Sequence, residues 1–398
     1  MPPQKAPAEV DHHPARAERD GPAGGLRRHL RFLDGIRGLA ALYVAIFHAC
    51  SFEGSNLVAK PWSLLVDCFR FGHLAVGVFI VLSGFCLMLP VVTDGGGHLP
   101  RGFAEYLRRR AWRILPPYYA AFGMSAAILA AGLALRGTGL VQGEDVRQGF
   151  SIGSFFSHLL LIHNLNVTWA YSVNSPLWTV ATEWQIYFLF PLVLLPMWRH
   201  FGNVASVTLG FGIGLAPMLF LRREQSLWWA GPWYLGLFGL GMAAADYSVR
   251  FRNREQAPSA PALLGIGSLA LLVLLCSLRP FTVPIWVLDA VVGLAASCLI
   301  AYCALEAAAT PAAGKHWLLR VLQSAPIAGL GAFSYSLYLI HFPLQRGLVR
   351  VLQTLHLTPE QILFIQIFIG MPLIIGLAYL FYQGCERPFM LHNRKRRK

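Results

Sequence analysis

Three ionisable side chains lie within one apolar stretch near the start of the chain, RFLDGIRGLAALYVAIFHAC: Asp34, Arg37 and His48. The eleven-residue step from Arg37 to His48 is about 20° past three full helical turns and roughly 16 Å along the axis, so both lie on one helix face. Asp34 can pair with Arg37 at i,i+3. Ionisable groups inside a membrane helix usually mark a functional cavity, although a snorkelling arginine and a packed histidine are the alternative.

A cluster of arginines precedes two prolines in the segment EYLRRRAWRILPPYY. Arg110 and Arg113 are one helical turn apart in this segment. Two planar guanidinium groups at that spacing could bind a phosphate or another anion through paired hydrogen bonds. Orientation of the chain by positive charge on the cytoplasmic side explains the cluster equally well, so both interpretations stay open.

Polar groups also lie in other apolar segments: Glu183 in LWTVATEWQIYFLFP, His341 in SYSLYLIHFPL and Ser83 in GVFIVLSGF. A carboxylate inside a membrane is costly unless it is paired or lines a cavity, so we expect Glu183 near the depth of His48, where it could orient or charge-stabilise the imidazole. His341 is as well explained by hydrogen-bonded helix packing as by a functional role. For Ser83, close helix packing is favoured over a nucleophile, because no GxSxG motif is present.

Together these groups predict a polar track, with Arg37, Arg110 and Arg113 at its inner end and His48, Glu183 and His341 further out. Such a track suits an anionic donor held on the cytoplasmic side, with its reactive end reaching into the membrane. Histidine, with an ordinary pKa near 6.5, suits a general base. No HxH, HExxH or paired-cysteine motif occurs, so we predict no metal site, and the seven scattered cysteines are expected to pack within helices.

The elements that must position these groups are long apolar segments. The chain has 398 residues, of which 13% are charged, against about 25% in a soluble protein. The segments approach the roughly 20 residues that cross a bilayer, which predicts an all-α polytopic integral membrane protein of about ten transmembrane helices. A shorter apolar run at 154–164 either spans or is re-entrant. The expected spans are 33–52, 71–90, 112–134, 177–197, 204–221, 228–246, 262–279, 284–305, 328–348 and 361–383.

The net charge of +14 lies in clusters between the apolar segments rather than along one face, which argues against a nucleic-acid partner. With ten spans and a cytoplasmic N-terminus, 23 Lys and Arg residues lie inside and nine outside, so we expect both termini in the cytoplasm. The predicted organisation is a disordered basic tail at 1–30, a membrane domain at 31–390 and a basic tail at 391–398.

Five motifs, in this order, resemble those of the membrane acyltransferase-3 family: LDGIRGLAALYVAIFH, GVFIVLSGF, RRAWRILPPYY, LWTVATEWQIYFLFP and SYSLYLIHFPL. The resemblance implies a ten-span bundle that moves an acyl group from acyl-CoA to a hydroxyl, usually on a sugar. It also implies that His48 is catalytic, that Arg37 matches the family's first arginine, and that Arg110 with Arg113 contacts the CoA donor. Glu183 matches the acidic motif position, although Trp184 stands where a second acid is common.

We therefore expect an integral membrane O-acyltransferase, multi-pass in a bacterial plasma membrane. Its donor substrate is acyl-CoA, carrying acetyl or another short acyl group, with no permanently bound cofactor. The acceptor is a polysaccharide, a glycolipid or a glycosylated small molecule such as a macrolide, as for the short, stand-alone members that the chain resembles. Transient acylation of His48 is a lesser alternative. The rival class is a transporter or flippase of a glycan or anionic lipid, which would not depend on acyl-CoA; a purely structural membrane partner leaves the ionisable groups unexplained.

Overall fold

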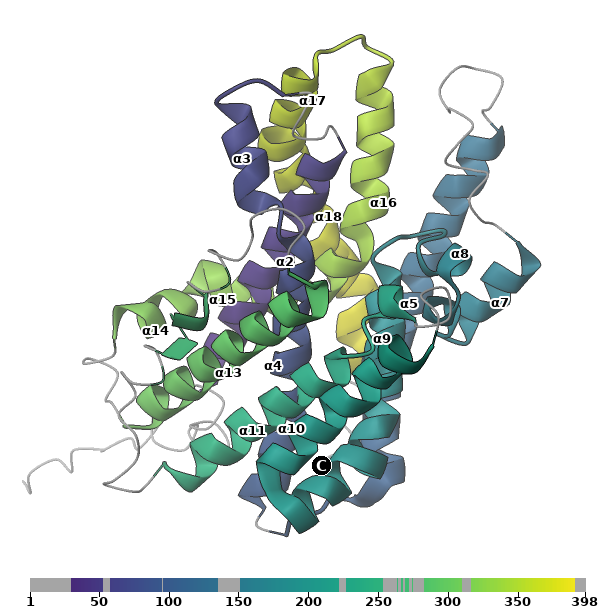
Figure 1. The fold of residues 1–398 in the computed structure, drawn as a ribbon. Helices are drawn as coiled ribbons and strands as arrows, with labels where there is room; N and C mark the ends of the chain where they lie inside the picture. The colour runs from purple at the N-terminus through teal and green to yellow at the C-terminus, as the bar shows by residue number, and fades with distance from the viewer. Residues whose placement is uncertain are drawn as a thin grey trace, which may run out of the picture.

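The computed structural model describes residues 30–52, 58–94, 96–134, 151–221, 227–252, 283–309 and 316–390, together with isolated positions between 263 and 274. Within these ranges the only regular elements are helices (Figure 1). The tails predicted at the two ends, except Leu30, lie outside the described residues. The helices are α2 (Arg31–Ser51), α3 (Trp62–Phe69), α4 (Gly72–Thr93), α5 (Gly102–Ala134), α7 (Ile152–Leu159), η3 (His163–Leu165), α8 (Val167–Ala170), α9 (Leu177–Leu189), η4 (Phe190–Leu194), α10 (Leu195–Phe220), η6 (Trp228–Ala230), α11 (Tyr234–Arg250), α13 (Ile285–Ala309), α14 (Trp317–Leu322), α15 (Ala325–Ala332), α16 (Ser334–Gln353), α17 (Pro359–Ile365), η8 (Gln366–Gly370), α18 (Met371–Phe381) and η9 (Tyr382–Glu386).

Helices α2 and α4 form the centre of the bundle (Figure 1). Helix α2 packs against α4, α15 and α16, while α4 packs against α2, α11 and α13. Helix α5 approaches from the other side and contacts α9, α16 and η9. One continuous core of buried apolar side chains connects these helices, including Phe32 on α2, Phe85 on α4 and Phe238 on α11. The predicted candidate residues all lie on helices of this central group.

Glycines on both helices allow the central pair α4 and α11 to approach backbone to backbone. A Cβ at Gly84 of α4 would lie 2.1 Å from the carbonyl oxygen of Phe238, and a Cβ at Gly241 of α11 would lie 2.0 Å from that of Val81. Close contact through small residues is the usual way in which membrane helices associate, because lipid supplies no hydrophobic drive between them. The seam between α4 and α11 therefore has no space for any larger side chain.

Among the described residues, six helical segments are long and apolar enough to cross a membrane, and a bent pair, α15 and α16 at 72°, would make a seventh. The prediction of about ten spans is not confirmed in the described residues. The two spans predicted at 177–197 and 204–221 fall in one helical run from Leu177 to Phe220, which bends at Gly202 with a φ of 81°. Helix α11, which overlaps the predicted span 228–246, has 17 residues and is not among these six, and most of 262–279 lies outside the described residues.

The doubtful run at 154–164 does not form a helix of spanning length. It is divided between α7, η3 and the turn that joins them. Some of its buried polar side chains are held locally: the Ser154 hydroxyl lies 2.7 Å from that of Ser172, and His158 Nδ1 lies 2.8 Å from the carbonyl oxygen of Ser154. Asn164 instead donates to Thr182 Oγ1 on α9 at 3.0 Å. The long apolar helices around it have the character of a multi-pass membrane protein.

Candidate active site

A cavity of about 260 Å³ lies between helices α2, α4, α5, α9 and α16. It brings together five of the residues that the sequence singled out, although they come from four different helices. The candidates that line it are Arg37, Ser83, Arg110, Arg113 and Glu183. Most of the remaining wall is apolar or aromatic. Charged side chains therefore share a small space among apolar walls, where their interactions are stronger than in bulk water.

Glu183 is fixed in the cavity wall by two hydroxyl groups. Ser83 Oγ and Tyr187 Oη each donate a hydrogen bond of 2.5 Å to the same carboxylate oxygen, Oε1. Both hydrogen bonds of this carboxylate within the described ranges therefore go to Oε1. Ser83 is thus a hydrogen-bond donor to the acid, which gives this residue a role that neither the packing nor the nucleophile interpretation contained.

Arg37 faces the cavity but is tied to its own helix at the edge. It donates to Asp34 Oδ1 at 3.2 Å and to Cys86 Sγ at 3.0 Å. The i,i+3 pair expected between Asp34 and Arg37 is confirmed as an ion pair. Asp34 itself is half-exposed and does not line the cavity. The aspartate holds the guanidinium in position, and the sulfur of Cys86 on α4 adds a contact that no sequence motif predicts.

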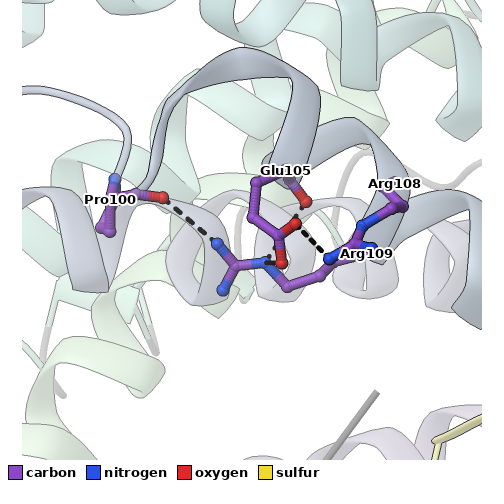
Figure 2. A network of polar contacts seen from close by, with 4 residues as sticks. All are labelled: Pro100, Glu105, Arg108 and Arg109. Carbon is purple, nitrogen blue, oxygen red and sulfur yellow. Dashed lines mark hydrogen bonds and ion pairs between the residues drawn. The ribbon is translucent and has the colours of Figure 1, made fainter. Parts of the chain in front are cut away.

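Two pairs of arginines on α5 have different surroundings. Figure 2 shows Arg108 and Arg109 around Glu105: Arg108 Nη2 lies 2.5 Å from Glu105 Oε2, and Arg109 bonds to the carbonyl oxygen of Pro100 at 3.2 Å. Arg110 and Arg113, by contrast, line the cavity, and neither has an ion-pair partner within the described ranges.

The Nε of Arg110 is buried with no hydrogen-bond partner in the described part of the chain. A buried donor of this kind is normally satisfied by protein, water or a ligand. Of the charged residues described around the cavity, three are guanidinium groups and one is a carboxylate. Asp34 pairs with Arg37 from outside the lining, so the guanidinium groups of the lining without an ion-pair partner in the described ranges are those of Arg110 and Arg113. These two groups suit an anion that can accept several hydrogen bonds.

His48 and His341 meet outside this cavity. Their ring centroids are 5.2 Å apart, across the contact between α2 and α16. His48 also contacts the rings of Phe47 and Phe342, at 4.8 and 5.0 Å between centroids. His341 is completely buried. Neither histidine is among the residues that line the arginine-containing cavity, so the predicted polar track is divided into two parts.

Glu183 belongs to the first part, not the second. The sequence placed it at the depth of His48, where it would support the imidazole, but its hydrogen-bond partners are Ser83 and Tyr187. The reason is tertiary: α9 packs toward α5 and α11, whereas His48 faces α16. The spacing of residues along one helix shows which of them share a face, but it does not show which neighbouring helix that face contacts.

An aromatic wall separates the two parts. The rings of Phe79 and Tyr338 line the cavity with their centroids 5.9 Å apart, and the ring of Tyr338 lies 5.8 Å from that of His341. The hydroxyl of Tyr338 lies 2.6 Å from Thr179 Oγ1 and donates to the carbonyl oxygen of Pro176 at 3.2 Å. Tyr338 is therefore held by both its ring and its hydroxyl.

Asn174 anchors the same region and was not singled out from the sequence. Its side-chain amide donates to the carbonyl oxygen of Leu339 at 2.9 Å and to Ser125 Oγ at 3.1 Å, so it connects α16 and α5 to the start of α9. An asparagine directly before a Ser-Pro helix start is a recognisable signal of a turn, but nothing local indicates its distant partners. No three His, Cys, Asp or Glu side chains are grouped as metal ligands in the described ranges.

Comparison with known proteins identifies the class. A family model described as an acyltransferase domain matches residues 30–383, so the chain belongs to the acyltransferase-3 family. A Staphylococcus aureus (strain COL) protein, provisionally named an O-acetyltransferase, is 24% identical over 379 residues, which cover 91% of this chain and 57% of the relative. The chain thus spans little more than half the length of that relative.

Two other relatives are named for the glycan on which they act. The Bacillus subtilis (strain 168) protein YrhL, provisionally named a peptidoglycan O-acetyltransferase, is 26% identical over 172 residues, or 42% of this chain and 24% of the relative. The peptidoglycan O-acetyltransferase OatA of Listeria monocytogenes is 22% identical over 195 residues, or 47% of this chain and 28% of the relative. No solved structure matches the chain significantly.

Proposed function

We propose that the protein transfers an acetyl or other short acyl group from acyl-CoA to a hydroxyl of a sugar-containing acceptor. The observation that carries this proposal is the cavity in which Arg37, Arg110 and Arg113 face a single carboxylate. A CoA-type donor carries several phosphate oxygens, and unpaired guanidinium groups bind such oxygens strongly and with defined geometry.

The cavity holds one end of the donor rather than the whole molecule. Its volume of about 260 Å³ lies below the roughly 300–1,000 Å³ of typical small-molecule sites. We infer that anionic groups of the donor contact Arg110 and Arg113, while the thioester extends past Tyr338 toward His48. The positive end of the site would then face the cytoplasm, with both chain termini on that side of a bacterial plasma membrane.

His48 acts as the general base in this mechanism. The acceptor oxygen attacks the thioester carbonyl carbon, a C–O bond forms, and the C–S bond breaks. His48 takes the hydroxyl proton during the attack and returns it to the leaving thiolate of CoA. Proton transfer of this kind contributes about 10²–10⁴-fold, and holding both substrates in one site adds orientation. Arg37 helps to hold the donor, and Glu183 offers Oε2 to it or to the acceptor.

A glycan is the acceptor class that we propose. Support comes from the relatives named as peptidoglycan O-acetyltransferases, which are 26% and 22% identical to the chain over 172 and 195 residues. Glycolipids and glycosylated small molecules such as macrolides remain within the same chemistry, because each presents a sugar hydroxyl. Membrane lipid surrounds the apolar helices in all of these cases.

Release of free CoA by purified protein in nanodiscs tests the proposal. Acetyl-CoA and propionyl-CoA would be offered with peptidoglycan fragments, glycolipids and macrolides, and with no acceptor. We expect acceptor-dependent release that is lost in His48→Ala and kept in the control His200→Ala, because His200 is exposed on α10. If neither CoA binding nor acceptor-dependent release is found across the panel, the acyltransferase mechanism is wrong for this chain and a transporter becomes the better interpretation.

A further inference from the structure

The protonation of His341 can be assigned from its hydrogen bonds. Its Nδ1 lies 2.8 Å from the carbonyl oxygen of Tyr338 and 3.1 Å from that of Leu337. A carbonyl oxygen only accepts hydrogen bonds, so Nδ1 carries the hydrogen. His341 is completely buried, and no described carboxylate forms an ion pair with it, so the ring is neutral. Its Nε2 therefore presents a lone pair.

This lone pair has no partner of its own. Nε2 of His341 is buried and accepts no hydrogen bond within the described residues. Because Nδ1 is bonded back to its own helix, Nε2 lies at the end of the ring that is farther from the backbone. The rings in contact with that imidazole are those of His48, at 5.2 Å between centroids, and Tyr338, at 5.8 Å. Of these two, the imidazole of His48 can offer an N–H from a ring nitrogen.

The two helices are locked together beside this pair. Gln345, one turn after His341 on α16, donates its side-chain amide to the carbonyl oxygen of Ala45 at 2.8 Å. Ala45 lies three residues before His48 on α2, and Gln345 is almost fully buried. The hydrogen bond fixes the register of α16 on α2 and so keeps the two imidazoles opposite each other.

We propose that His341 is a positioning residue that acts through His48. The two rings form no hydrogen bond in this structure, but when the His48 ring turns toward His341, Nε2 of His341 can accept the N–H of one nitrogen of His48. The other nitrogen of His48 is then unprotonated and available as the base. When His48 takes the acceptor's hydroxyl proton, its original N–H stays hydrogen-bonded to His341 Nε2. The newly bound proton, on the other nitrogen of His48, then passes to the thiolate of CoA. In a catalytic triad, a carboxylate accepts the N–H of the histidine and fixes its tautomer. Here the imidazole of His341 has that role. This inference rests on the proposed function.

Three substitutions at His341 distinguish positioning from packing. His341→Asn keeps an N–H near the helix carbonyl oxygens but removes the acceptor at the Nε2 position. His341→Gln places an amide oxygen near that position, and His341→Phe keeps only the ring volume. We expect kcat to fall about 100-fold in the Asn and Phe variants, with KM for acetyl-CoA unchanged, and to recover to within about tenfold of wild type in the Gln variant.

A packing role predicts a different pattern. Activity would then follow the amount and thermal stability of folded protein in nanodiscs, and His341→Phe would be the most active variant. Full kcat in a folded His341→Asn protein would overturn the proposal. If wild-type protein releases no CoA with any acceptor, the proposed function fails instead, and a second measurement decides the histidine pair.

That second measurement needs no reaction. In protein labelled with ¹⁵N-histidine, with the signal of His48 identified by its loss in His48→Ala, we expect one fixed tautomer of His48 in wild type. The same tautomer is expected in His341→Gln, and a mixture of tautomers in His341→Asn. An unchanged single tautomer in His341→Asn would show that His341 does not orient His48, whatever the activity of the enzyme.

Discussion

The cavity that contains the arginines and the contact between His48 and His341 differ in almost every physical property. The first is lined by three guanidinium groups and a hydrogen-bonded carboxylate. The second consists of two imidazoles among phenylalanine rings, with no described carboxylate paired to either. A charged space binds anions, whereas a weakly polar one favours a neutral base that can exchange a proton. The proposed mechanism places donor binding and proton transfer at different helix contacts, with the ring of Tyr338 in contact with both regions.

The largest expected effect is on turnover and comes from the imidazole side. His48→Ala should lower kcat by about 10²–10⁴-fold, because the base is lost. Binding of CoA, measured by calorimetry in nanodiscs, should stay within about twofold, because His48 does not line the arginine-containing cavity. A large loss of CoA affinity in this variant would remove the distinction between the two regions.

The reverse effect is expected on the arginine side. Arg110→Ala and Arg113→Ala should each weaken CoA binding by about 10–100-fold, because a hydrogen bond to a charged group contributes roughly 1.5–3 kcal/mol. Arg108→Ala is the matched control: it removes the same charge from the same helix, but Arg108 pairs with Glu105. Equal losses in all three variants would mean that only the total charge matters.

The aromatic wall should show an intermediate effect. Tyr338→Phe keeps the ring but removes the hydroxyl that contacts Thr179, and we expect it to cost about 0.5–1.5 kcal/mol of stability with nearly normal turnover. Tyr338→Ala removes the ring, so water can reach the thioester and CoA release without an acceptor should rise. Comparing acceptor-free and acceptor-dependent CoA release in the two variants tests the wall. Equal acceptor-free rates in both would contradict it.

The smallest effect on activity is expected from changes in a second histidine pair, which lies outside the spanning helices. His158 and His163 stack with ring centroids 3.9 Å apart, and both are completely buried. Burial, with a smaller contribution from His158, lowers the pKa of His163 to about 3. The unfolded chain binds this proton below about pH 6.5, so the stabilisation is complete above that value and is lost as the pH falls toward 3.

His163→Phe tests this second pair. Wild-type protein should lose about 2 kcal/mol of stability from this group between pH 7.5 and pH 5, and the variant should lose less. Thermal unfolding in nanodiscs at the two pH values measures the difference, while turnover at pH 7.5 should be close to that of wild type. Loss of turnover in a stable His163→Phe protein would show that the second pair has more than a packing role.

Much of the site could be predicted from single helices. Arg37 and His48 belong to α2 as expected, the Asp34 pair forms, and Arg110 and Arg113 share one face of α5. Spacing within a helix fixes such relations, because the helical repeat is known before the fold is. The different surroundings of Arg108 and Arg110 also follow from spacing. Glu105 lies one helical turn before Arg108 and pairs with it, whereas Arg110 points to another side of the helix.

Contacts between helices could not be predicted in the same way. The hydrogen-bond partners of Glu183 depend on how α9 packs in the bundle, and the ring that contacts His48 depends on how α16 packs against α2. The number of spans has a similar cause. Hydropathy marks apolar length, but the bend at Gly202 and the 72° angle between α15 and α16 are set by backbone conformation and packing.

The glycine seam between α4 and α11 bears on how natural variation in this family should be interpreted. Across that seam Gly84 approaches Phe238, which does not line the cavity. Gly84 nevertheless directly follows Ser83, whose hydroxyl donates a hydrogen bond to the carboxylate of Glu183. Any side chain there would push α4 sideways and carry Ser83 with it. A saturation mutagenesis map should therefore show intolerance along the seam as severe as in the cavity, and such positions would be mistaken for substrate contacts by anyone who ranks residues on intolerance alone.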